Sequence, residues 1–127
     1  MDFNFKNSLP IWTQLADKLR ERIVTGEYPA GGRFPSVREL AAEAAVNPNT
    51  MQRAMSQLEA EGLLVTSRNF GRSVTEDSEV LAATKKTLAK ERAAEYLESM
   101  KALGYTAEDA GQLLLAVSAE KNVQNVD

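Results

Sequence analysis

The 127-residue sequence contains no cysteine and no histidine. These absences exclude a disulfide framework, thiolate or imidazole metal sites, and the Ser-His-Asp and Cys-His arrangements of nucleophilic enzymes. Carboxylates and lysines remain as acids and bases, but no glycine-rich phosphate loop or pair of carboxylates stands out. We therefore expect a protein that is not an enzyme and that needs no cofactor.

Long hydrophobic runs are also missing. The longest uncharged, mostly apolar stretch near a terminus is 111–119, well short of the ~18 to 20 residues that cross a bilayer. The amino end carries Asp2 and Lys6 and no apolar segment typical of a signal peptide. We expect a soluble, cytoplasmic protein with no membrane partner.

Positive charge is scarce, since 15 lysines and arginines stand against 18 aspartates and glutamates, for a net charge of -3. Taken alone, this charge argues against a nucleic-acid partner. The charges are unevenly distributed, however. Residues 1–74 hold nine basic and eight acidic residues, whereas residues 75–127 hold six and ten. The acidity therefore belongs to the second part of the chain, and a nearly neutral first part can still present a basic face.

The first part of the chain contains the pattern of an amphipathic helix. Ser8 and Pro10 suit a helix start, because serine caps free amides and proline fits the first turn. Leucine or isoleucine then recurs at every fourth position from Ile11 to Ile23, and Gly26 is a stop signal. We predict a helix between Ser8 and Gly26.

Two more helices follow in quick succession. Ser36 with Glu39 three residues later forms a capping box for a short second helix. Asn47 and Pro48 combine a cap with a first-turn proline, and Gly62 ends the third helix that they begin. Only a few residues separate the second helix from the third.

A hairpin is predicted directly after the third helix. Residues 63–67 favour a strand, 68–71 supply turn residues, and 72–75 read as a returning strand. Asn69 tolerates a left-handed conformation and could therefore shape the turn. Three helices and a hairpin in this order predict a winged helix-turn-helix, in which the third helix enters the major groove of DNA.

The remainder of the chain favours a helical tail. Residues 76–103 contain no glycine or proline and have apolar residues at helical spacing. Gly104 and Tyr105 break this helix, and Thr106 with Asp109 can cap another. We predict a mainly α fold: an α+β winged helix-turn-helix domain over residues 1–75, followed by a two-helix dimerisation tail over residues 76–127.

The third helix carries side chains suited to reading DNA on the face opposite its apolar stripe. Asn49, Arg53 and Ser56 lie on that face, flanked by Thr50 and Gln52. Asparagine and glutamine can pair with adenine and arginine with guanine, while serine and threonine reach base edges or phosphates. The same residues would also make an ordinary solvated helix face.

Residues 8–75 resemble the GntR family of bacterial transcriptional regulators in order and spacing. The runs that carry the resemblance are Pro10 to Leu15, Gly26 to Tyr28, Phe34 to Ala41, Val46 to Thr50, Leu58 to Leu64 and Arg68 to Val74. The Asn-Pro helix start and the short tail look most like the YtrA-like branch, whose tail is a two-helix dimerisation unit with no enclosed ligand pocket. The wing departs from the family's usual Gly-x-Gly followed by an aromatic residue, because it reads Asn-Phe-Gly-Arg-Ser.

The resemblance implies a set of DNA contacts from the second helix, the start of the third helix and the wing. Carried over, these residues are Ser36, Arg38, Asn47, Asn49, Thr50, Arg53, Arg68 and Gly71. We add Gln52 and Arg72 because they flank the same surfaces. Alternatives remain for the arginines: Arg38 could pair with Glu39 on the surface, and Arg68 and Arg72 could be ordinary edge-strand charges.

The apolar stripe of the tail must be covered, because two helices cannot bury both of their apolar faces alone. We expect it to pack on a second copy of the chain, although packing on the chain's own winged domain is an alternative. The expected dimerisation residues are Tyr96, Leu97, Met100, Leu103, Leu113, Leu114 and Val117.

These features favour a homodimeric repressor that binds a palindromic operator in double-stranded DNA. The alternative is a winged-helix protein-interaction module that does not bind DNA, which the negative net charge supports. A small-molecule effector in the crevice between two copies is left open, whereas a metal effector held by histidines is excluded.

Overall fold

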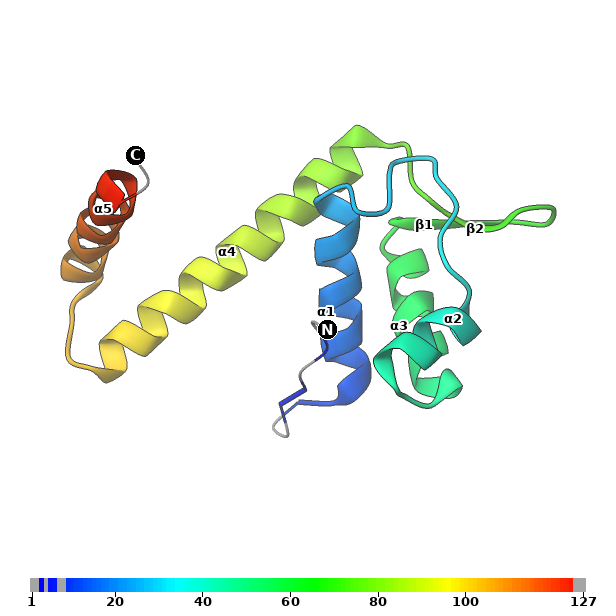
Figure 1. The fold of residues 1–127 in the computed structure, drawn as a ribbon, viewed down its shortest axis with the longest axis horizontal. Coiled ribbons are helices and arrows are strands. Elements are labelled where there is room, and N and C mark those ends of the chain that lie inside the picture. The colour runs from blue at the N-terminus through cyan, green and yellow to red at the C-terminus, as the bar shows by residue number, and fades with distance from the viewer. Residues whose placement is uncertain (1–2, 4, 7–8, 125–127) are drawn as a thin grey trace. The chain divides into compact units, whose positions relative to one another are not determined.

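The computed structural model describes residues 3, 5–6 and 9–124. The chain forms two compact units, Met1–Lys86 and Thr87–Asp127, which divide inside a long helix. The first unit contains α1 (Ile11–Val24), α2 (Val37–Ala44), α3 (Pro48–Ala60), β1 (Leu64–Ser67) and β2 (Gly71–Val74). The helix α4 (Ser78–Ala102) begins in the first unit and ends in the second, which also contains α5 (Ala107–Gln124) (Figure 1).

The predicted winged helix-turn-helix fold is confirmed, with one difference at its first helix. The expected cap Ser8 lies outside the described residues, and Pro10 occupies the N-cap position without a side-chain cap. The hydroxyl of Thr13 instead donates a hydrogen bond of 2.7 Å to the carbonyl oxygen of Pro10. The first turn of α1 is thus stabilised from within the helix.

The caps of the next two helices follow the sequence prediction. The backbone N–H of Glu39 donates to Ser36 Oγ at 3.1 Å, and that of Asn49 donates to Asn47 Oδ1 at 2.7 Å. Pro48 occupies the first turn of α3, where its missing N–H removes no helical hydrogen bond. Between the helices, Ala45 has a φ of 56° and reverses the chain in the left-handed conformation.

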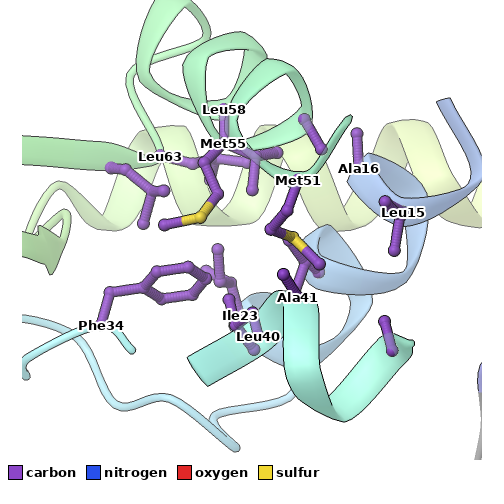
Figure 2. Packing of buried hydrophobic residues seen from close by; sticks show 14 of the residues in the cluster. Leu15, Ala16, Ile23, Phe34, Leu40, Ala41, Met51, Met55, Leu58 and Leu63 are labelled. Carbon is purple, nitrogen blue, oxygen red and sulfur yellow. The ribbon is translucent and has the colours of Figure 1, made fainter. Parts of the chain in front are cut away.

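The core of the first unit lies between the three helices and the base of the hairpin. Met51 and Met55 of α3 are fully buried, and Figure 2 shows them pointing toward Ala41 and Phe34. The buried residues of α1, among them Leu15 and Leu19, belong to the same cluster. Among the described residues, the buried members of this cluster are Leu15, Ala16, Leu19, Ile23, Phe34, Leu40, Ala41, Ala44, Met51, Ala54, Met55, Leu58, Leu63, Leu64 and Val74.

The hairpin pairs β1 with β2 in antiparallel register, with Ser67 opposite Gly71 at its outer end. The loop between α1 and α2 adds further backbone hydrogen bonds along β2, including one of 2.9 Å from Phe34 N–H to the Arg72 carbonyl. The left-handed residue at the turn is Gly71, with a φ of 71°, and not Asn69, for which we expected that role. Glycine has no Cβ and therefore adopts this conformation without steric cost.

The second unit is a pair of helices joined at Gly104. The N–H of Asp109 donates to Thr106 Oγ1 at 3.1 Å, so the predicted cap of α5 is confirmed. The Tyr96 hydroxyl donates to the Ala110 carbonyl oxygen at 2.6 Å and ties the two helices together. Ala110 is the one buried hydrophobic residue among the described residues of this unit. Within the described part of the chain, no helix is both long and apolar enough to cross a membrane.

The left-handed Ala45 leads to a test of local backbone strain. A residue with a Cβ costs about 1 to 2 kcal/mol in this conformation, and the side chain of Ala45 is exposed. We expect Ala45→Gly to raise the free energy of unfolding by about 0.5 to 1 kcal/mol in urea denaturation. The matched control is Ala42→Gly, at an exposed position within α2, which should lower it by about 1 kcal/mol. An equal decrease in the free energy of unfolding of both variants would show that the backbone at Ala45 is not strained.

Candidate nucleic-acid interface

The face of α3 opposite the core is polar and exposed. Met51, Ala54, Met55 and Leu58 are buried on the inner side. Successive helical residues are rotated by about 100°, so burying these four turns their neighbours outward. The exposed residues of α3 that sequence reasoning assigned to DNA are Asn49, Gln52 and Arg53, and Ser56 is exposed beside them. The structure therefore brings the predicted base-reading residues together on one surface.

Arg53 is held in place by an aromatic side chain from another helix. Its guanidinium lies over the Trp12 ring, 4.4 Å from the ring centroid. Such a cation–π contact is worth about 0.5 to 1 kcal/mol at an exposed site and restricts the orientation of the arginine. The sequence does not indicate this pairing, because 41 positions separate Trp12 from Arg53 and no local pattern joins them.

The other polar residues around α3 serve local structure as well. Gln52 donates a hydrogen bond of 3.0 Å to Ser56 Oγ, which aligns two adjacent polar groups along the exposed face. The side-chain oxygen of Asn47 is used as the cap of α3, and the N–H of Thr50 donates to the Asn47 carbonyl at 3.0 Å. The amide nitrogen of Asn47 therefore remains the part of this side chain suited to a phosphate.

The amino end of α2, the helix that precedes α3 in the chain, supplies a second group of polar residues. Arg38 is exposed, and within the described residues it makes no ion pair with Glu39 or with any other carboxylate. Ser36 Oγ accepts the cap hydrogen bond from Glu39 N–H, which leaves the hydroxyl hydrogen available to a phosphate.

The two arginines of the wing differ in their surroundings. Arg68, in the turn, is exposed, whereas Arg72 pairs with Glu59 at the end of α3 through an Nε to Oε1 distance of 2.5 Å. Glu59 also accepts a hydrogen bond of 2.7 Å from Thr66 Oγ1. This hydrogen bond, together with the pairing to Arg72, holds the pKa of Glu59 below its usual value. Arg72 thus joins the wing to the third helix, a contact that the sequence did not indicate.

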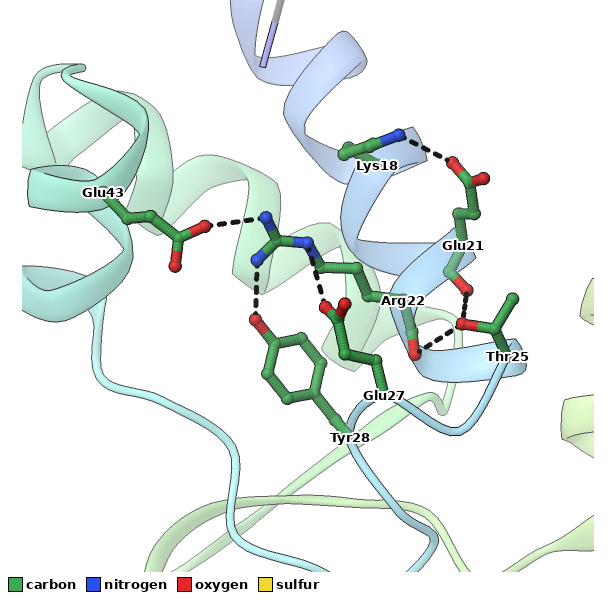
Figure 3. Close-up of polar contacts among 7 residues, drawn as sticks. All are labelled: Lys18, Glu21, Arg22, Thr25, Glu27, Tyr28 and Glu43. Atoms are coloured by element: carbon green, nitrogen blue, oxygen red, sulfur yellow. Dashed lines mark hydrogen bonds and ion pairs between the residues drawn. The ribbon is translucent and has the colours of Figure 1, made fainter. Parts of the chain in front are cut away.

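The basic residues of α1 form ion pairs, whereas most of the arginines assigned to DNA do not within the described residues. Arg22 contacts Glu43 at 2.7 Å and Glu27 at 3.1 Å and donates to the Tyr28 hydroxyl at 2.8 Å (Figure 3). Arg20 pairs with Glu61 at 2.6 Å, and its hydrogen bonds lower the pKa of that carboxylate. In the part of the chain that the structure describes, no carboxylate partner is present for Arg33, Arg38, Arg53 and Arg68.

Three helices and a two-stranded wing, with an outward polar face on the third helix, define a winged helix-turn-helix protein of the DNA-binding class. Residues 12–74 match the family described as bacterial regulatory proteins, gntR family. Together with the relatives described next, this match shows that the chain belongs to the GntR family and, within it, to the YtrA-like branch.

Relatives of similar length support this assignment over most of the chain. The HTH-type transcriptional regulator YhcF of Bacillus subtilis is 39% identical over 86% of this chain and 90% of its own length. The HTH-type transcriptional repressor YtrA of the same species is 31% identical over 91% of this chain and 89% of its own. A solved GntR family regulator from Listeria monocytogenes has 35% identity and a TM-score of 0.78, covering 88% of this chain and 98% of that one. The chain is accordingly a transcriptional regulator with a helix-turn-helix DNA-binding fold.

The contact between Arg53 and Trp12 can be tested without DNA, because Trp12 is the single tryptophan in the chain. We expect Arg53→Ala to uncover one face of the indole and to increase quenching of its fluorescence by acrylamide. The free energy of unfolding should fall by about 0.5 to 1 kcal/mol. Arg38→Ala, which removes another exposed arginine that has no contact to the indole, should leave quenching unchanged. Identical quenching in the two variants would disprove the contact.

Proposed function

We propose that this GntR regulator is a repressor that binds a palindromic operator as a homodimer. The observation that carries the proposal is a set of exposed arginines that have no carboxylate partner within the described residues: Arg53 on the outward face of α3, Arg38 on α2, Arg68 on the wing and Arg33 on the loop before α2. In a domain with nearly balanced charges, this arrangement gives one face the positive charge that phosphates require.

The proposed contacts divide by chemistry. Asn49, Gln52 and Arg53 reach base edges in the major groove, where amide and guanidinium groups distinguish adenine and guanine. Phosphate contacts come from Ser36, Arg38, Asn47 and Thr50, which lie around the start of α2 and α3. Arg68 and the backbone at Gly71 contact the DNA backbone or the minor groove next to the site bound by α3. Because Arg72 pairs with Glu59, its proposed role is to hold the wing against α3.

The homodimer is proposed from the exposed apolar surface of the second unit. Leu97, Leu103, Leu114 and Val117 are each exposed by 41% or more, whereas Tyr96, Met100 and Leu113 are partly buried. A second copy would cover these side chains through a two-fold interface. Two recognition helices related by that axis would read half-sites about ten base pairs apart, which makes the operator palindromic. The repressor role rests on the similarity to the repressor YtrA.

Salt dependence tests operator binding directly. We expect a duplex selected from a random library to bind with an affinity that falls steeply with salt, with a log–log slope of about -0.9 per phosphate contacted. Arg38→Ala should reduce the magnitude of the slope by about one, whereas Arg53→Ala should cost about 1 to 3 kcal/mol and relax the preference at one base pair. Fluorescence anisotropy at several salt concentrations measures both effects.

The control for these variants is Lys121→Ala, which removes an exposed positive charge from the second unit and should leave the slope unchanged. Failure to bind any duplex in a salt-dependent way would contradict the proposed function and favour the protein-interaction module instead. Binding that survives the simultaneous reversal of Arg38 and Arg53 to glutamate would contradict the contacts proposed for these two arginines.

The dimer can be tested by placing a charge on the proposed interface. We expect Leu114→Glu to convert the dimer to a monomer in sedimentation velocity and to weaken operator binding at least about tenfold, because two half-sites are no longer bound together. Ala116→Glu is the matched control, since it lies on the same helix, is exposed and points about 200° away. It should remain a dimer. Circular dichroism confirms that α5 stays helical, and a dimeric Leu114→Glu would contradict the interface.

A further inference from the structure

The tip of the wing carries a large aromatic side chain in contact with water. Phe70 is 75% exposed and lies in the turn between β1 and β2. Exposed turns usually hold small or polar residues, because these favour the required backbone conformations and interact with water. The phenyl ring contributes little to the folded domain, so its presence at the tip points to an external contact.

The surroundings of Phe70 indicate the chemistry of that contact. Arg68 precedes it by two positions, and Arg33 lines the same shallow grooves beside the wing as Phe70 and Gly71 do. Neither arginine has a carboxylate partner within the described residues. Between Glu61 and Glu76 the sequence contains no acidic residue at all. An apolar ring flanked by positive charge complements a groove that has phosphates along its edges and bases at its floor.

The backbone at the tip makes the ring accessible. Gly71 has a φ of 71°, and nothing lies within 4 Å of the position that a Cβ there would occupy. The turn is therefore slender at the residue after Phe70, because Gly71 has no side chain and its Cβ position borders open space. A ring carried on such a narrow support can enter a groove about 6 Å wide, the width of the minor groove in ordinary DNA.

We propose that Phe70 is an apolar wedge that enters the minor groove next to each half-site and partly unstacks one base step. The inference rests on the proposed operator binding and adds a second determinant of sequence preference to it. Apolar side chains that enter the minor groove separate stacked bases, and pyrimidine–purine steps deform with the smallest energetic cost. The operator should therefore favour such a step at the position under the wing, although no hydrogen bond reads it.

The experiment uses the full chain and the duplex selected by the wild type, with 2-aminopurine placed in turn at positions flanking each half-site. The fluorescence of this base rises when it unstacks. We expect the wild type to raise emission at one flanking step and Phe70→Ala to abolish the rise. We also expect Phe70→Ala to weaken binding about tenfold, in the range of losing one aromatic–base contact, while the salt slope is unchanged because no charge is removed.

Val65→Ala is the matched control, since it removes a half-exposed apolar side chain from the same hairpin. It should retain both the emission change and the affinity. Phe70→Ala should unfold at the wild-type temperature, because the ring is exposed. Phe70→Leu, which keeps an apolar side chain, should restore part of the affinity.

The results separate the wedge from the function on which it depends. If the wild type binds a duplex and Phe70→Ala matches it in affinity and emission, the wedge is wrong and the regulator function stands. If the wild type binds no duplex, the proposed function fails and the wedge fails with it. If Phe70→Ala instead changes the oligomeric state in sedimentation velocity without changing the emission at any step, Phe70 contacts a second copy of the chain and the wedge is overturned.

Discussion

Burial of one side of α3 is the constraint that fixes its outward face, where Asn49, Gln52 and Arg53 lie. Its two methionines, Met51 and Met55, fill the space between α1 and α2 and have no exposed surface. Because the helix is rigid, fixing the inner side fixes the direction of every outward residue. Core packing thus orients the side chains that we propose contact DNA, and a change in the core would turn them even if none of them were altered.

The ion pairs of the first unit determine where its negative charge lies. Glu61 pairs with Arg20, and Glu43 and Glu27 pair with Arg22. The negative charge of these three carboxylates is thereby held next to the arginines of α1. The arginines without a carboxylate partner among the described residues keep their positive charge at the surface. The formal net charge is therefore a poor measure of the electrostatic potential near them.

The sequence indicated the fold more fully than the site. Helix limits, the caps at Ser36 and Asn47, and the hairpin depend on residues within a few positions of one another, and local rules describe such patterns well. The contacts of Arg53 with Trp12 and of Arg72 with Glu59 depend on tertiary packing. Local rules contain no information about such partners, which is why Arg68 and Arg72 looked equivalent in the sequence.

Glu59 connects α3 to the wing. One carboxylate accepts from Thr66 on β1 and pairs with Arg72 on β2, while its own backbone belongs to the last turn of α3. The wing is therefore braced near its outer end by α3, the helix that we propose reads the major groove. A force that tilts the hairpin is transmitted to that helix through a short, charged connection. Sequence preferences in the two grooves would then be coupled energetically, and substitutions at the two surfaces would not act independently.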